Sequence, residues 1–147
     1  KVDLVKVVIP IYKNTFSKME MRSLTQAYEV LHSYPLVVIK PLSLDLSELQ
    51  VEFPKLIVTS FDDNYFKGIS GYNHLMLTSE FYERFLDSQY ILIYQLDAFV
   101  FRDELADWCN KGYDYIGAPW LQNTPVHHNR NSCNLPVYGL KIWDFFF

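Results

Sequence analysis

The first 40 residues contain two runs rich in β-branched residues, with a helical pattern between them. Residues 6–12 are rich in valine and isoleucine, which favours a buried strand, and residues 36–40 repeat that composition. Between them, residues 18–32 carry apolar side chains at steps of three and four, the spacing of an amphipathic helix. A strand, a helix and a second strand in this order predict a parallel pair of strands joined by a right-handed crossover.

The remaining chain continues the alternation. Gly68 and Gly71 are expected to break the chain, and residues 118–136, rich in Asn, Pro and His, are expected to form a loop. We expect further strands at 55–60, 90–96 and 113–117, helices at 72–78, 80–86 and 104–110, and a helical turn at 46–50. This order predicts an α/β fold with a mostly parallel sheet flanked by helices.

Length and composition indicate one globular domain over residues 1–147. Half of the residues are hydrophobic and 17% are aromatic, including 11 tyrosines, which fill a core or contact ring-shaped ligands. The net charge is −4 and the basic residues are scattered, so we expect no nucleic-acid partner. No apolar run approaches the roughly 20 residues of a membrane span, and no secretory signal is visible, so we expect a cytoplasmic protein with reduced Cys109 and Cys133.

Ligands of open parallel sheets bind beyond the carboxyl ends of the strands. Here that rule points to residues 10–14, 60–64 and 95–99. Asp97 stands out because it follows the hydrophobic run 90–96, so its carboxylate is expected to project into the crevice. There it can hold a divalent cation or accept a ribose hydroxyl, whereas the plainer alternative is an aspartate that caps the next turn.

Residues 94–101, Tyr-Gln-Leu-Asp-Ala-Phe-Val-Phe, resemble the segment that carries the Asp-x-Asp motif of GT-A glycosyltransferases. Residues 7–12 resemble the opening strand that touches the nucleobase, and residues 68–76 resemble the helix that leads toward the donor site. The resemblance extends over roughly residues 7–120.

A narrower resemblance is to an uncharacterised bacterial glycosyltransferase-like family. Its three blocks are Ser-Gly-Tyr-Asn at 70–73, Tyr-Gln-Leu-Asp at 94–97 and Tyr-Asp-Tyr-Ile-Gly-Ala-Pro-Trp at 113–120. The blocks are specific as a set, although each alone is a weak signal.

These resemblances imply a Rossmann-like GT-A fold that moves a sugar from a nucleotide-sugar donor to a hydroxyl acceptor, in bacterial surface polysaccharide synthesis. The implied partners are a nucleotide-sugar and a glycan or lipid-linked acceptor, met at the inner membrane face. Asp97 would approach the ribose, or a metal bridging the diphosphate. Pro10 and Tyr12 would lie near the base, and Tyr72 and Asn73 would approach the donor from the helix side.

Phe99 departs from the motif because it stands where the second aspartate would ligate Mn²⁺ or Mg²⁺. One carboxylate and a diphosphate make a poor site for a hard cation. Three explanations stay open: the metal is dispensable, another acid such as Asp103 substitutes, or the donor is bound without turnover. Without a cation, a basic side chain should offset the diphosphate charge. The candidates are Lys13, Lys67 and Arg130.

No catalytic base can be assigned, because Asp114 and Asp144 are the only late acids and neither fits the role. The apolar end, residues 143–147, resembles a strand or helix severed from its continuation, or a frameshifted end. We therefore expect an incomplete domain that is inactive alone and self-associates through this end.

Two other clusters contain residue types that can bind metal ions. His127 and His128 with Cys133 lack a zinc spacing, so a solvated loop is expected, and the acidic residues 62–64 are expected to form an ordinary turn rather than a calcium site. Two further functions stay open beside the transferase: a non-catalytic nucleotide- or carbohydrate-binding module, and an interaction domain that has lost its ligand.

Overall fold

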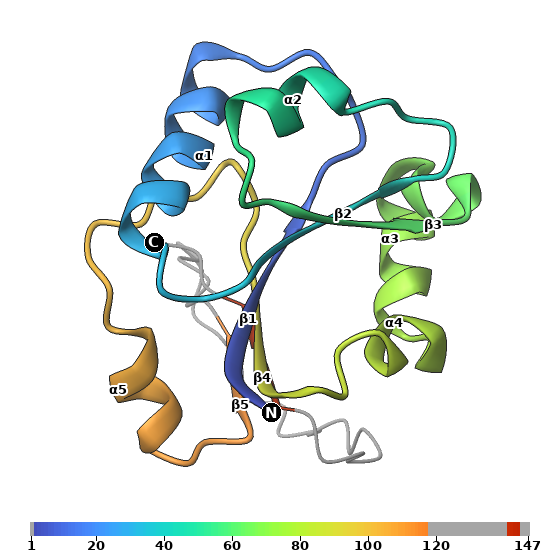
Figure 1. Ribbon diagram of the computed structural model, residues 1–147. Coiled ribbons are helices and arrows are strands. Elements are labelled where there is room, and N and C mark those ends of the chain that lie inside the picture. The colour runs from blue at the N-terminus through green and yellow to red at the C-terminus, as the bar shows by residue number, and fades with distance from the viewer. Residues whose placement is uncertain (1, 118–140, 145–147) are drawn as a thin grey trace, which may run out of the picture.

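A parallel sheet forms the centre of the protein, as the computed structural model of residues 2–117 and 141–144 shows (Figure 1). Within these residues, six strands lie in the order β3-β2-β1-β4-β6-β5, and every neighbouring pair is parallel. The strands are β1 (Asp3–Pro10), β2 (Leu36–Pro41), β3 (Ile57–Phe61), β4 (Ser88–Ile93), β5 (Tyr115–Ile116) and β6 (Lys141–Asp144). The predicted α/β fold with a parallel sheet is confirmed.

Helices cover both faces of this sheet. They are α1 (Lys18–Val30), α2 (Ser47–Glu52), the 3₁₀-helix η1 (Asp63–Phe66), α3 (Gly68–Met76), α4 (Ser79–Glu83) and α5 (Leu105–Asn110). In Figure 1, α1 and α5 lie on one side of the strands and α3 and α4 on the other, which gives a Rossmann-like three-layer arrangement. Among the described residues, no helix combines the length and the apolar character that a membrane crossing requires.

The two faces of β1 are buried in two separate cores. Val5, Val7 and Ile9 pack in the core that includes residues of α1, α2 and α5, whereas Val8 packs in the core under α3 and α4. Side chains of a strand alternate between faces, so a strand covered on both sides is apolar throughout. That requirement explains the β-branched run from which this strand was predicted.

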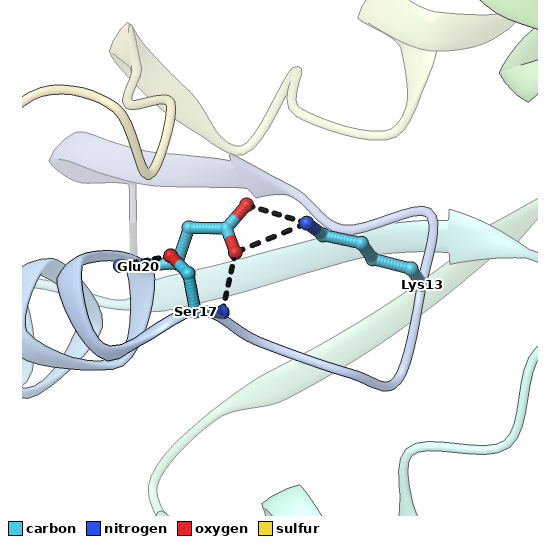
Figure 2. A network of polar contacts seen from close by, with 3 residues as sticks. All are labelled: Lys13, Ser17 and Glu20. Carbon is cyan, nitrogen blue, oxygen red and sulfur yellow. Dashed lines mark hydrogen bonds and ion pairs between the residues drawn. The ribbon is translucent and has the colours of Figure 1, made fainter.

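Helix α1 begins where its sequence predicts, with a capping box. Ser17 Oγ accepts a hydrogen bond from the Glu20 backbone N–H at 3.2 Å, and Glu20 Oε2 accepts one from the Ser17 N–H at 2.7 Å. Lys13, from the loop after β1, adds an ion pair to the same Glu20 carboxylate at 2.8 Å (Figure 2). The helix entry is therefore fixed to the loop that leaves β1.

The expected break at Gly68 is present, since η1 ends at Phe66 and α3 begins at Gly68, but the expected break at Gly71 is wrong, because α3 runs through it. Gly68 adopts a φ of 68°, which suits glycine at the turn into the helix. At Gly71, an added Cβ would lie 3.1 Å from the Tyr65 carbonyl carbon and closer still to the Asn64 carbonyl oxygen. This glycine therefore serves a close helix approach and not a turn.

Several of the sequence predictions lie outside the described residues. These are the loop at 118–136 with Arg130, His127, His128 and Cys133, and the last residues, 145–147. Of the apolar end, residues 143 and 144 belong to the backbone of β6.

Candidate functional site

The strand order places a topological switch point between β1 and β4. From β1 the chain moves to β2 and then β3 on one side, and it returns to the other side of β1 with β4. Connections that leave in opposite directions open a crevice at the carboxyl ends of the two strands. Residues that follow β1 and β4 therefore lie at the place where open α/β sheets bind ligands.

Strand β4 ends at Ile93, so the prediction that it continues to Leu96 and that Asp97 terminates it is wrong. The physical reason lies in β1. With Val8 paired to Ile93, the next ladder bond toward the carboxyl end would need a hydrogen on the Pro10 nitrogen, and proline has none. Pro10, predicted to lie near a base, thus ends the β1–β4 ladder.

Released from the ladder, the chain after β4 forms a β-turn. The Ala98 N–H donates to the Gln95 carbonyl at 3.0 Å, which places Leu96 and Asp97 at the two central positions. The Asp97 side chain is exposed at this turn. The carboxylate is therefore exposed at the switch point, four residues beyond the last residue of β4.

A buried network fastens this turn to α1. Ser23, 2% exposed, and Tyr94, 3% exposed, bring their hydroxyl oxygens within 2.7 Å of each other. Ser23 Oγ donates to the Ala98 carbonyl at 2.5 Å, and Tyr94 Oη lies 3.1 Å from the same oxygen. Each hydroxyl has one hydrogen, so the shortest route runs from Tyr94 through Ser23 to Ala98. Burial raises the pKa of the Tyr94 hydroxyl, which keeps it protonated as a donor.

The loop that leaves β1 presents Tyr12 at the same edge of the sheet. Its neighbour Ile11 is buried and donates its N–H to the Ile39 carbonyl at 2.9 Å, which holds the start of the loop against β2. Tyr12 itself is 62% exposed, and Lys13 Nζ lies 5.9 Å from the centre of its ring. An exposed aromatic ring is thus available at the end of the strand where the base was expected.

Phe99 lies two residues beyond Asp97 and is half-buried. Its ring packs edge-on against Phe101 at 5.2 Å between centroids, and the Arg22 guanidinium carbon lies 6.0 Å from its centre. Arg22 is an exposed residue of α1, next to Ser23 in the chain. Sequence reasoning missed Arg22, because the contact joins residues 77 positions apart.

Tyr72 and Asn73 come from α3, on the opposite face of the sheet from α1. Tyr72 is half-buried and Asn73 is exposed. The helix contacts η1 and α4, and it follows β3, which β2 separates from β1. Their place in a donor site stays a prediction.

Of the three basic side chains expected to balance a diphosphate, Lys13 is neutralised by Glu20. This pair holds the pKa of Lys13 above and that of Glu20 below their usual ranges, and the hydrogen bond between them is the main cause for both. Lys67 donates to Asn64 Oδ1 at 2.8 Å, beyond β3. Arg130 lies outside the described residues.

Two hollows adjoin the two ends of α1, the polar one near its start and the apolar one at its C-cap residue Leu31. One, of about 230 Å³, is polar and lies between the loop after β1 and α2; the other, of about 370 Å³, is apolar and lies between α1, β4 and α5. The polar hollow carries Asn14 and the acids Asp45, Glu48 and Glu52, which suit hydroxyl and amino groups rather than phosphates. The apolar hollow is lined by Trp108 and Phe101, and Arg102, which also lines it, is paired with Glu104 at 2.6 Å.

The other acids considered as metal ligands, Asp62, Asp63 and Asp103, have structural partners. Asp62 Oδ1 accepts from the Asn64 N–H at 2.9 Å, a local contact, and Asp63 Oδ1 accepts from the N–H of Ser43, 20 residues away, at 3.0 Å. Asp103, the suggested substitute ligand, accepts from the Leu105 N–H at 3.1 Å and from the Tyr34 hydroxyl at 3.0 Å. Within the described residues, no group of three or more metal-binding side chains comes together.

Comparison with known proteins identifies one family whose model matches this chain. A search of the curated proteins finds no match to this chain. A family model described as a protein of unknown function (DUF5672) matches residues 55–139, which is more than half of the 147 residues and includes α3, β4 and the Asp97 turn. The chain belongs to the DUF5672 family.

Proposed function

We propose that this chain binds a nucleotide-sugar at the β1–β4 switch point and belongs to a glycosyltransferase that moves the sugar to a hydroxyl acceptor. The observation that carries the proposal is the Asp97 turn. An exposed carboxylate stands at the position where α/β sheets bind ligands, and a buried network that includes Ser23 and Tyr94 fixes the turn beneath it. Ordinary surface turns do not need such support.

The groups around the carboxyl ends of β1 and β4 each suit one part of a nucleotide-sugar. The Asp97 carboxylate accepts hydrogen bonds from ribose or sugar hydroxyls. Tyr12 offers an aromatic face on which a base stacks. The polar hollow beside α2 provides acceptors for amino and hydroxyl groups. Tyr72 and Asn73 would contact the donor from the α3 side.

The wider setting follows from this donor. A nucleotide-sugar is a cytoplasmic metabolite, so the proposal places the protein in the cytoplasm, at the inner membrane face when the acceptor is lipid-linked. The acceptor would be a glycan or lipid-linked sugar of a bacterial surface polysaccharide. A transferase must also align donor and acceptor, and residues outside this edge would provide that alignment.

Phe99 supports a second candidate, a nucleotide- or carbohydrate-binding module without catalysis. An apolar ring stands where a metal-dependent transferase needs its second carboxylate, so a catalytic metal site is incomplete. Such a module would bind its ligand and leave it unchanged.

A thermal-shift screen separates these possibilities. The samples contain UDP, GDP, CMP, their sugar conjugates, or free glycans, each with and without Mn²⁺. Binding at a hundredfold excess over the dissociation constant stabilises the native state by roughly 2.7 kcal/mol, which is a readily measured shift. A shift with one nucleotide supports the donor site, and a shift with glycans alone supports a carbohydrate-binding module. No shift with any nucleotide would contradict the proposal.

A further inference from the structure

We propose that Arg22 binds the phosphate groups of the ligand, so that the site takes a diphosphate without a divalent cation. The ligand's being a nucleotide-sugar rests on the proposed function, whereas the anion site itself is argued from the side chains around the Asp97 turn.

Arg22 lies close to the Asp97 turn. It is next to Ser23 on α1, and Ser23 donates to the carbonyl of Ala98, the residue between Asp97 and Phe99. The guanidinium carbon lies 6.0 Å from the centre of the Phe99 ring. A hydrogen bond between buried groups and a ring contact thus attach α1 to the adjacent residues Ala98 and Phe99. Arg22 is therefore held beside the turn that carries Asp97.

The charge of the Arg22 side chain is not offset by an acid in the described residues. Within the described residues, Arg22 forms no ion pair, whereas Lys13 is paired with Glu20 and Arg102 with Glu104, at 2.8 and 2.6 Å. Lys67 lies beyond β3 and is held by Asn64. Arg22 thus keeps a full positive charge beside the turn, on an exposed side chain that a ligand can reach.

The guanidinium group of Arg22 suits phosphate oxygens. A guanidinium presents paired N–H donors that match two phosphate oxygens, and it remains charged at every physiological pH. An aromatic ring beneath it restricts its motion and leaves its N–H edge free for an anion. Phe99 provides that ring and provides no ligand for a cation. Phe99 therefore stands where a metal ligand would be, and its ring contacts Arg22, whose positive charge takes the place of the metal.

Calorimetric titration with inorganic pyrophosphate in EDTA tests this assignment without any nucleotide. Arg22→Gln should weaken pyrophosphate binding about tenfold or more, because a charge-assisted bond is lost. Arg84→Gln is the matched control, since Arg84 lies 5.3 Å from the Phe61 ring on the other face, and it should bind as the unchanged protein does. Arg22→Lys keeps the charge and should restore part of the affinity.

Each outcome bears on the proposal. Metal-free pyrophosphate binding that Arg22→Gln weakens and Arg84→Gln leaves intact supports it. Absence of metal-free binding, equal binding by Arg22→Gln, or equal losses in both variants would overturn it. Nucleotide titrations of the same samples test the proposed function separately: pyrophosphate binding without nucleotide preference contradicts the function alone, and nucleotide binding only with Mn²⁺ contradicts the Arg22 assignment alone.

Discussion

Ser23 Oγ and Tyr94 Oη lie 2.7 Å apart in the core, and both reach the carbonyl oxygen of Ala98. One hydroxyl comes from α1 and the other from the chain just after β4, 71 residues later. Because two buried hydroxyls contact the carbonyl oxygen of the same turn, the geometry of the turn is fixed by the core. The exposed Asp97 therefore stands on a rigid support.

This network predicts non-additive losses of stability. Tyr94→Phe and Ser23→Ala should each cost about 1 kcal/mol, because one hydroxyl remains to donate to the Ala98 carbonyl. The double variant leaves that carbonyl without a donor, so its cost should exceed the sum of the single costs by roughly 1 kcal/mol. Urea denaturation of the four proteins measures this coupling.

Tyr82→Phe is the control for that cycle. Tyr82 donates to the Met76 carbonyl at 2.6 Å on the other face of the sheet, so its loss should add to that of Ser23→Ala without coupling. Purely additive losses for Ser23→Ala and Tyr94→Phe would contradict the network.

Gly71→Ala should destabilise the protein although alanine is the better helix former. An alanine Cβ would overlap the Asn64 carbonyl oxygen, and overpacking of this kind costs about 1–3 kcal/mol, more than the gain of about 1 kcal/mol in helix propensity. Ser70→Ala, at the exposed neighbouring position, should be neutral or slightly stabilising. Equal melting temperatures for both variants would show that α3 does not pack this closely on η1.

Burial raises the pKa of the Cys109 thiol from 9.0 to about 11. The protonated thiol is the form that the folded state favours, so its contribution to stability is complete below pH 9 and is lost as the pH rises through 11. In Cys109→Ala, the free energy of unfolding should therefore decrease less between pH 9 and pH 11 than in the unchanged protein. In a Cys133→Ser background, a thiol reagent should label the native protein far more slowly than the urea-unfolded protein; equal rates would mean an accessible Cys109.

Phe99→Asp should create the cation dependence that the chain lacks in this account. A second carboxylate two residues after Asp97 gives a hard cation two oxygen ligands beside the diphosphate. Nucleotide affinity of this variant should rise with Mn²⁺, whereas that of the unchanged protein should not respond. Titrations with and without Mn²⁺ measure both, and an Mn²⁺ response in the unchanged protein would contradict the role given to Phe99.

Much of the fold was predictable because its signals are local. The β-branched runs gave β1 and β2, and the Ser17–Glu20 spacing is that of a capping box. Gly112, with a φ of 73°, follows α5 as predicted. By contrast, the end of β4 depends on Pro10 in the neighbouring strand, and the reason for Gly71 lies in the carbonyl of Asn64. Neither constraint is visible from the residues alone.

The positions of Asp97 and Tyr12 were predictable, because both follow strands of a parallel sheet. Their exposure agrees with that expectation, and their roles stay a prediction. Arg22 and Ser23 could not be found from the sequence, because two polar residues of an amphipathic helix look like its solvent face. Only the fold shows that Ser23 is buried against Tyr94 and that Arg22 adjoins Phe99.

The most direct test of the central claim is calorimetric titration of nucleoside diphosphates into the unchanged protein, Asp97→Asn and Asp107→Asn. Asparagine suits the same turn position, so the fold and the melting temperature should be retained. Asp107, an exposed acid of α5, controls for the lost charge. We predict that Asp97→Asn weakens binding of the preferred nucleotide about tenfold or more, whereas Asp107→Asn does not. Equal affinity in all three proteins would contradict a ligand site at the Asp97 turn.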